Sequence, residues 1–405
     1  MKRFRHACLV WHRYAGLFMA LFLAVAGLTG SILAFRDQID RMLDPHLHAR
    51  ALPGATRVPL IEIAQRMKNR VPHAAVAMIT RDDDAVTVGF QAERNPETGK
   101  RYALPIRSLA VNPWTGEEMG AAESVRFTTY VLKLHDRLFG GSPGYLFMGL
   151  VALVWTVDCF VAFYLTMPLF RRGFWRQWKP AWLIKRNAGT YRLNLDLHRA
   201  FGLWLWPMLF VFAWSSVAFN LRFPVYEFVM KHTVGYDSQI SALMTLAEQR
   251  GKEPPVDDAP AVDWARAEAT GRALVEARGR QQGFSVGDTL MAGDIPQLRA
   301  YTVGVLTSEM VGNKPAGALT MFEADGTPLL VMVYSGGTLG NTIETWFSAL
   351  HTTKGFGLWY QVFVACLGMV IAMFSVTGVY LWWTKRAVRT RHKGQPTNAT
   401  ADAVA

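Results

Sequence analysis

The chain has 405 residues, of which 51% are hydrophobic and only 18% are charged. The apolar residues are gathered in blocks, so the composition excludes an ordinary soluble enzyme and indicates a membrane protein. The formal net charge of +12 comes from three short stretches, 1–13, 171–192 and 385–405, which hold 4, 7 and 5 Lys+Arg and one acidic residue. Each stretch flanks an apolar run, as the positive-inside rule requires, so we expect a lipid bilayer and no nucleic acid as partner.

Four apolar runs predict four transmembrane helices, and they lie at residues 14–35, 145–170, 200–221 and 356–384. Each run reaches the length of about 20 residues that a helix needs to cross a hydrocarbon core of about 30 Å. The basic stretches predict that both termini and the 171–192 loop are cytoplasmic. We therefore expect the two long polar segments in the periplasm and the protein in a bacterial inner membrane.

Both polar segments show the pattern of a small α+β unit. The first predicts a helix near residues 60–70 and then strands at 76–80, 85–91 and 106–112. The second predicts a helix near 262–278 and then strands at 300–306, 318–324 and 329–334. The polar, proline-rich stretch 252–260 reads as a connector. The order helix, outer α+β module, helix therefore occurs twice, which predicts an internally duplicated membrane protein of the α-helical class.

These patterns divide the chain into eight parts. They are the N-terminus with helix one (1–35), the first outer module (36–130), helix two (131–170), a basic cytoplasmic loop (171–192), helix three (193–222), the second outer module (223–345), helix four (346–384) and a basic cytoplasmic tail (385–405).

Four of the ten histidines fall into two pairs, one at each side of the expected membrane. His12 and His198 lie at the cytoplasmic ends of helices one and three, and His135 and His351 lie near the outer ends of helices two and four. A four-helix bundle can hold a haem at each end between two histidines, because the axial ligands approach the iron from opposite sides. We therefore predict two b-type haems, ligated by His12 with His198 and by His135 with His351.

Glycine spacing supports this prediction. A glycine follows His12, His198 and His351 after four residues, a spacing that leaves room for a flat ring beside the ligand on one helix face. Arg13 and Arg199 each follow an inner histidine, where they could pair with haem propionates or reach lipid phosphates.

Asp158 lies within helix two and is costly in lipid, so we expect it to face the bundle interior. It could relay a proton or form a hydrogen bond to a neighbouring helix. There are only three cysteines and no C-x-x-C-H motif, so neither covalent haem nor an iron–sulfur cluster is expected.

Three motifs carry a family resemblance: "HRYAGLFMALFLAVAGLTGSILAFRDQID" in helix one, "LHRAFGLW" in helix three and "FSVTGVYLWWTKR" in helix four. The sequence resembles the PepSY-associated transmembrane family and, within it, the inner-membrane di-haem ferric-siderophore reductases. The resemblance implies four transmembrane helices, two haem b groups, periplasmic PepSY-like modules, and electron transfer to a ferric siderophore outside. It assigns the ligand roles to His12, His198, His135 and His351. Helix two departs from the pattern, since "TVDCFVAFYLTMP" stands where helix four keeps its aromatic ending.

The expected reaction is a one-electron reduction, which loosens iron because oxygen ligands hold ferrous iron less tightly than ferric iron. The cytoplasmic segments are too short for a flavin or nicotinamide domain, so the electron donor is a separate cytoplasmic protein or a quinol.

Two other interpretations of the function stay open. One is a haem-free regulatory membrane protein that binds a peptidase, and the other is a haem-bearing membrane subunit of a separate reductase.

Overall fold

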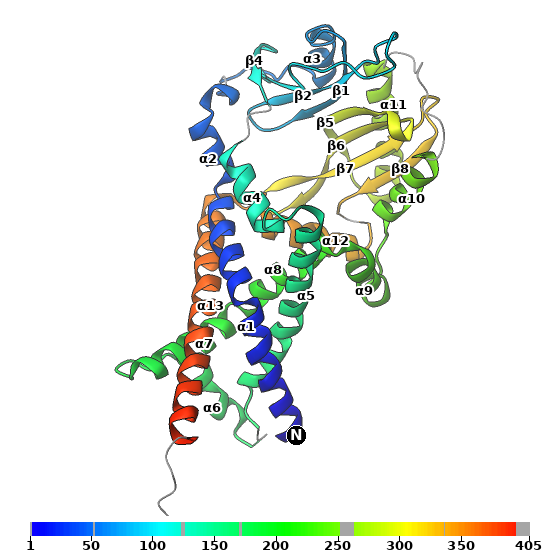
Figure 1. Cartoon of the computed structure of the whole chain (residues 1–405). Helices are drawn as coiled ribbons and strands as arrows, with labels where there is room; N and C mark the ends of the chain where they lie inside the picture. Colours follow the sequence, from blue (N-terminus) through cyan, green and yellow to red (C-terminus); the bar gives the residue numbers. More distant parts are fainter. Residues whose placement is uncertain are drawn as a thin grey trace, which may run out of the picture. The chain divides into compact units, whose positions relative to one another are not determined.

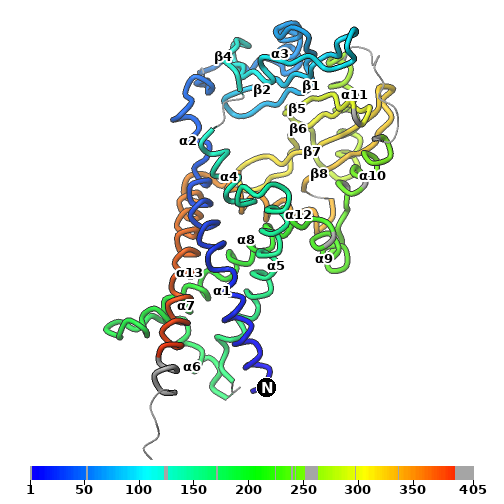
Figure 2. The backbone as a smooth tube through the Cα atoms, viewed as in Figure 1, coloured from blue at the N-terminus to red at the C-terminus, as the bar shows by residue number. Residues whose placement is uncertain are grey.

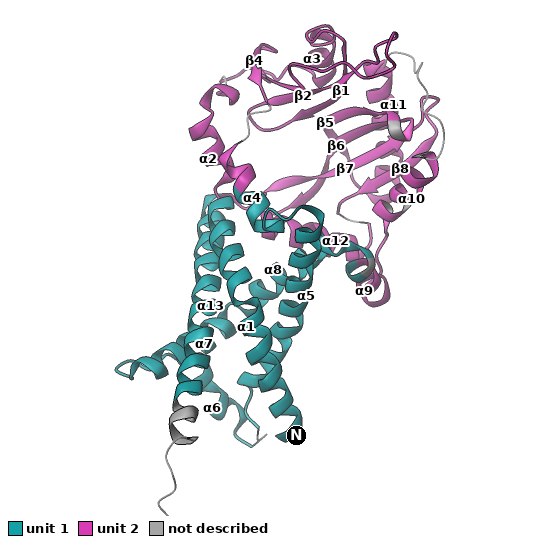
Figure 3. Ribbon diagram, in the orientation of Figure 1, with its two compact units in different colours: residues 1–34, 131–226, 358–405 teal, residues 35–130, 227–357 magenta. Residues whose placement is uncertain are grey.

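A computed structural model of the chain describes residues 2–51, 53–122, 126–169, 172–251, 263–335 and 337–393. They form two compact units, each built from segments far apart in sequence (Figures 1 and 3). Unit 1 comprises residues 1–34, 131–226 and 358–405, and unit 2 comprises residues 35–130 and 227–357. The expected connector 252–260 and the tail beyond residue 393 lie outside the described residues.

Unit 1 contains three helices that are long and apolar enough to cross a membrane, which are α1 (Lys2–Leu33), α5 (Gly141–Thr166) and α13 (Gly357–Lys393). The smooth backbone trace in Figure 2 follows them as long, nearly straight segments. Helix α1 begins well before its apolar run, so that His12 lies ten residues inside the helix. The basic residues at its start are good helix formers and extend it beyond the apolar stretch.

The third apolar run is not one straight helix. It contains α7 (Thr190–Trp204) and α8 (Trp206–Asn220), which are bent by 72° at Leu205. Pro207 lies in the first turn of α8, where it cannot continue an α-helix because it lacks an N–H and its ring clashes with the preceding turn. The described chain thus has three candidate spans, or four if the bent pair is one span.

The predicted second and fourth helices each contain a short helix before the long one. The short helices are α4 (Phe127–Arg137) and α12 (Leu339–Thr352). Left-handed backbone separates them from α5 and α13, with φ of 59° at Phe139 and 60° at Thr353. His135 therefore lies on α4 and His351 on α12, and neither lies on a spanning helix.

The remaining helices are short. They are α2 (Arg36–Leu43), η1 (Pro45–Leu47), α3 (Leu60–Arg66), α6 (Phe174–Trp178), η2 (Lys179–Trp182), a π-helical turn η3 (Arg222–Tyr226), α9 (Glu227–Thr233), α10 (Gln239–Gly251), α11 (Trp264–Gln282) and η4 (Pro296–Leu298). Helices α3 and α11 lie where the sequence predicts them.

Unit 2 is built on one antiparallel sheet of eight strands in the order β4-β3-β2-β1-β5-β6-β7-β8. The strands are β1 (Ala74–Arg81), β2 (Val86–Ala92), β3 (Ser108–Val111), β4 (Glu118–Ala121), β5 (Val286–Ile295), β6 (Ala300–Val311), β7 (Lys314–Phe322) and β8 (Pro328–Val333). Strands β1 and β5 pair at the centre, with Ile79 opposite Ala292. The two expected modules are therefore halves of one sheet.

One hydrophobic core joins these halves. Helices α3 and α11 pack on the sheet, and side chains from both segments are fully buried together, including Ile63, Ile79, Val88, Val275 and Val303. The sequence missed β5 because Gly287, Asp288, Gly293 and Asp294 interrupt its apolar pattern, and such residues are depleted in strands.

Close contact between small residues holds α1 against α13 in unit 1. A Cβ atom added at Gly368 would lie 2.3 Å from the carbonyl oxygen of Gly27 and 2.3 Å from the Ser31 hydroxyl oxygen. The Ser31 hydroxyl donates a hydrogen bond to the carbonyl of Ala365 on α13, at 2.7 Å. Small residues of this kind let helix backbones approach closely where lipid gives no hydrophobic drive to association.

We expect Gly368→Val to separate α1 from α13, since a side chain there meets backbone that cannot rotate away. The cost should be about 1–3 kcal/mol or more, seen as a lower unfolding midpoint of the detergent-solubilised protein. Met369→Val is the matched control, because Met369 is 54% exposed on the same helix. Equal midpoints for the two variants would contradict this packing.

Candidate functional site

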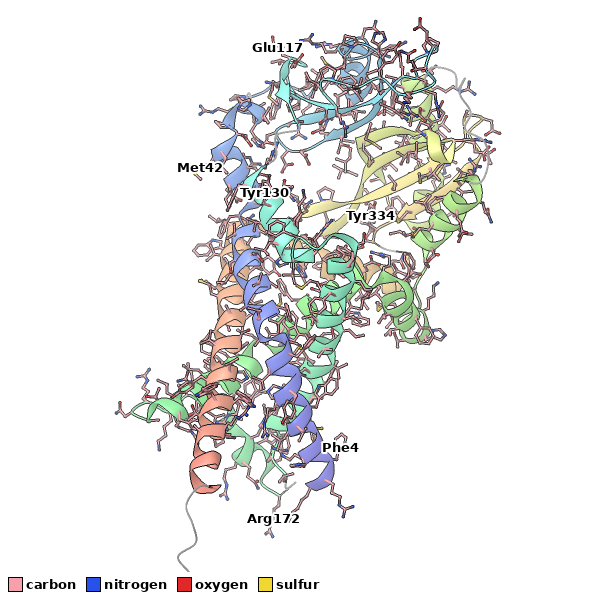
Figure 4. The ribbon with its side chains drawn as sticks, viewed as in Figure 1. Phe4, Met42, Glu117, Tyr130, Arg172 and Tyr334 are labelled. Atoms are coloured by element: carbon pink, nitrogen blue, oxygen red, sulfur yellow. The ribbon has the colours of Figure 1, made fainter. Side chains whose placement is uncertain are left out.

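One end of unit 1 is defined by the start of α1 and the end of α5. The ring of Phe4, labelled in Figure 4, lies 5.5 Å from the ring of Tyr164. The Arg5 guanidinium donates hydrogen bonds to the carbonyls of Leu165 and Met167 at 2.7 and 2.9 Å. Helices α1 and α5 are thus antiparallel, and this end, which we call the N-terminal end, carries the first histidine pair.

His12 on α1 and His198 on α7 lie together at the N-terminal end. Their ring centroids are 6.2 Å apart and their planes are inclined by 65°. The histidines come from helices that are 186 positions apart in the sequence, and the bend at Leu205 gives α7 a direction of its own relative to α8. The structure thus brings the two predicted inner ligands together, with one ring edge-on to the other.

Asp158 on α5 holds the ring of His12. The His12 Nδ1 atom lies 2.9 and 3.1 Å from the two carboxylate oxygens of Asp158. Asp158 is buried, with 6% of its surface exposed. Because a carboxylate only accepts hydrogen bonds, Nδ1 of His12 is the nitrogen that donates to Asp158, and Nε2 is the ring nitrogen that this bond leaves unused. Of the two roles predicted for Asp158, the structure contains the hydrogen bond to a neighbouring helix.

Thr377 on α13 holds the ring of His198 in the same manner. The His198 Nδ1 atom lies 3.1 Å from the Thr377 hydroxyl oxygen. That hydroxyl already donates to the carbonyl of Met373 at 2.8 Å, so it accepts from His198 and leaves Nε2 unprotonated. The next residue, Gly378, faces the same ring, and a Cβ atom there would lie 3.6 Å from Cε1 of His198.

A second arrangement of this kind holds His135 near the other end of α1. The His135 Nδ1 atom lies 3.0 Å from the hydroxyl oxygen of Thr29, which donates its own proton to the carbonyl of Val25 at 2.6 Å. Gly30 faces the ring, and a Cβ atom there would lie 3.2 Å from Cε1. His12 and Thr29 are 17 positions apart on one helix, which corresponds to about 26 Å. The two sites therefore lie toward opposite ends of α1.

The sequence interpretation missed these threonines. Thr29–Gly30 and Thr377–Gly378 form the same dipeptide inside an apolar run, and each gives a histidine both a hydrogen-bond acceptor and free space. A Thr–Gly dipeptide repeated in the first and last apolar runs is the pattern that could have drawn attention to them. Alone it is weak, because threonine in such a helix commonly bonds its own backbone.

His351 lies on α12 in unit 2, whereas His135 belongs to unit 1. The expectation that Gly355 lies on the helix face of His351 was wrong. Helix α12 ends at Thr352, and Gly355 has φ of 89° in the turn that follows. For His12 and His198 the expectation holds, since Gly16 and Gly202 are helical and a Cβ atom at either would meet nothing within 4 Å.

The arginines beside the inner histidines differ from one another. Arg199 donates to the carboxylate of Asp196 at 2.8 Å and to the carbonyl of Pro180 at 2.7 Å. Asp196 is fully buried and also accepts from Arg192 at 2.9 Å, so this group ties the 172–189 loop to α7. Arg13 is half-buried, and among the described residues it forms no ion pair.

The geometry of the His12–His198 pair fits a metal centre held between two imidazoles. Each metal–nitrogen bond is about 2 Å, so the ring centroids of two opposed ligands lie about 6 Å apart. A bare edge-to-face contact has a similar spacing. The hydrogen bonds at both Nδ1 atoms favour the ligand interpretation, because metal-binding histidines commonly donate their other N–H to a carboxylate or another acceptor.

The donor set favours haem over an isolated ion. Within the part of the chain that the structure describes, no group of three or more His, Cys, Asp or Glu side chains is placed to hold a metal ion. Two imidazoles alone are too few for a protein zinc site, which commonly has three or four protein ligands. Haem needs only axial ligands from the protein, because the porphyrin provides the other four nitrogens.

Residues 9–385 match the family model described as the PepSY-associated TM region. The match covers nearly the whole chain, and the protein belongs to this family of membrane proteins. No curated protein matches the sequence.

We expect Thr377→Val to destabilise the protein by about 1 kcal/mol, because the Nδ1–H of His198 loses its acceptor. The control is Thr384→Val, which removes a hydroxyl that bonds only the backbone carbonyl of Tyr380 on the same helix. Thermal unfolding in detergent measures both variants. If the two substitutions cost the same, the hydroxyl of Thr377 does not hold His198.

Proposed function

We propose that the protein is a transmembrane di-haem b oxidoreductase that reduces a ferric siderophore or another ferric chelate on the outer side of a bacterial inner membrane. The observation that carries the proposal is the His12–His198 pair. Two rings from separate helices have their centroids 6.2 Å apart, and each has its Nδ1 bonded to a side chain of a further helix. Nε2 is thereby the nitrogen left to bind iron on both.

The sheet supports four membrane crossings. Strands β1 and β5 pair directly, so residues 35–130 and 227–357 lie on the same side of the membrane. The chain between them must then cross an even number of times, and α5 supplies one crossing. The bent pair of α7 and α8 therefore acts as a single span. With α1 and α13 this makes four, which puts both termini on one side, and the basic stretches assign that side to the cytoplasm.

Internal duplication would relate the two ligands within each proposed site to one another. Each half of unit 2 runs from a helix into four consecutive antiparallel strands, and each half of the chain has a short helix with a histidine before a long apolar helix. Repeats in membrane proteins commonly place functional sites where the repeats meet.

In this proposal His12 and His198 bind the inner haem, and His135 and His351 bind the outer haem. Bound haem supplies a carrier of one electron at each end. The chain itself bonds the Nδ1 atoms of His12, His198 and His135 through Asp158, Thr377 and Thr29, and keeps open space beside the inner rings at Gly16 and Gly202. Arg13 and Arg199 lie beside the inner ligands, where Arg13 has no ion pair among the described residues and is available to a propionate.

The overall reaction moves one electron from a donor to one ferric ion. The donor, a quinol or a soluble reductase on the cytoplasmic side, is oxidised, and the chelated ferric ion becomes ferrous. Ferrous iron binds hard oxygen ligands less tightly, so the chelator releases it. No general acid, base or nucleophile is required.

Purified protein should contain two haem groups per chain, measured as a pyridine haemochrome. Because each pair shares one iron, His12→Ala or His198→Ala should leave one haem, and so should His135→Ala or His351→Ala. His232→Ala is the control, since this exposed side chain bonds only the backbone carbonyl of Phe228. A colourless protein from cells supplied with haem would exclude the proposal and favour the regulatory alternative.

Dithionite-reduced protein should then be reoxidised by ferric siderophores, and the b-type absorption band should return to its oxidised form. Stoichiometric appearance of ferrous iron, trapped with a ferrous-specific chelator, measures the product. A haem-bearing subunit of another reductase would instead keep its reduced spectrum with every ferric chelate until its partner is added.

A further inference from the structure

We propose that the Asp158 carboxylate lowers the midpoint potential of the inner site, so that the chain itself directs electrons toward the outer site. This inference rests on the proposed function, and it concerns a residue outside the set of iron ligands. It follows from a difference among the side chains that bond the Nδ1 atoms of three histidines, of which one is a carboxylate and two are hydroxyls.

Asp158 is the only acidic residue in α5, and among the described residues no lysine or arginine forms an ion pair with it. Its side chain is 8% exposed, so water screens its charge poorly. Both of its oxygens lie within 3.1 Å of the Nδ1 atom of His12. The negative charge of Asp158 is therefore directed at the imidazole of His12.

A carboxylate that accepts the Nδ1–H of a metal-binding histidine raises the donor strength of the other ring nitrogen. The charge-assisted hydrogen bond pulls the proton toward the carboxylate and leaves more electron density on Nε2. A stronger donor, with a negative charge behind it, stabilises ferric iron more than ferrous iron. Asp158 thereby lowers the potential at the site that His12 shares with His198.

The hydroxyl partners lack this effect. Thr377 and Thr29 are neutral, and each already donates its own proton to a backbone carbonyl, at 2.8 and 2.6 Å. Such hydrogen bonds fix the ring and add no charge. Near His135 the closest carboxylate along the chain is Asp136, and Arg137 neutralises it with two hydrogen bonds of 2.5 and 2.7 Å.

The consequence is a potential step across the membrane. Electrons enter from the donor at the N-terminal end of unit 1, where Asp158 favours their departure. They are then drawn to the site of His135, where the hydroxyl of Thr29 exerts no opposing charge. This difference in potential opposes return of the electron to the donor side. The hydrogen-bond partners of the histidines therefore favour electron transfer from the inner site to the outer site.

The test is a redox titration of the purified holoprotein, followed by visible absorption. In Asp158→Asn the lower of the two midpoint potentials should rise, and the upper one should stay unchanged. A tenfold change in the redox equilibrium corresponds to about 59 mV for one electron, and we expect a rise of at least this size. Asp158→Glu keeps the charge and should stay close to the wild type. Asp37→Asn is the control, because it removes an exposed carboxylate from α2 in unit 2.

A haemochrome count accompanies each titration. Two haems in Asp158→Asn with unchanged potentials would overturn the inference and leave the proposed function intact, whereas absence of haem from the wild type would overturn the proposed function itself. If Asp158→Asn loses a haem, Asp158→Ser replaces it, since serine gives His12 the kind of partner that His198 and His135 have. Loss of the inner haem in both variants would show that Asp158 is needed for binding and not for tuning, and would also overturn the inference.

Discussion

The helix bundle depends on one constraint, which is that polar atoms placed among apolar helices must find partners within the protein. An imidazole has two nitrogens, and in this chain the Nδ1 atoms of His12, His198 and His135 are each bonded to a side chain of a different helix. These bonds fix the tautomer, orient the ring and join helices that are distant in sequence. The same interactions that satisfy the histidines in the bundle also leave the second ring nitrogen of each for the proposed iron.

The packing and bending of the helices position the side chains that bond these histidines. The close contact of Gly27 with Gly368 brings α1 and α13 together, and these helices carry Thr29 and Thr377. The 72° bend at Leu205 separates α7 from α8, so that His198 follows a helix direction different from that of the apolar run after it. If the third helix were straight, α7 would continue along the axis of α8, and His198 would lie at a different place. The irregular backbone is thus part of how the site is built.

Unit 2 adds a second constraint through its sheet. Pairing of β1 with β5 makes one core from two segments that are far apart in the sequence. Two strands that are hydrogen-bonded in one sheet must lie on the same side of a membrane. This simple requirement, together with the apolar helices, supports the proposed four crossings, in which the bent pair of α7 and α8 would be one span.

The sequence by itself determined the membrane class, the apolar helices, most strands and the family, because these follow from hydrophobic length, periodicity and motifs that act locally along the chain. It also singled out His12 and His198, since a basic, histidine-bearing helix start occurs twice. Only the tertiary structure decided that Asp158 bonds His12, that Thr29 and Thr377 hold the other rings, and that the two outer segments share one sheet. Such pairings join residues more than 100 positions apart. The local sequence around a threonine or aspartate in an apolar run does not indicate which other helix its side chain contacts. The direction and packing of the helices determine which side chains bond the histidines, and these depend on the tertiary structure, not on the local sequence pattern.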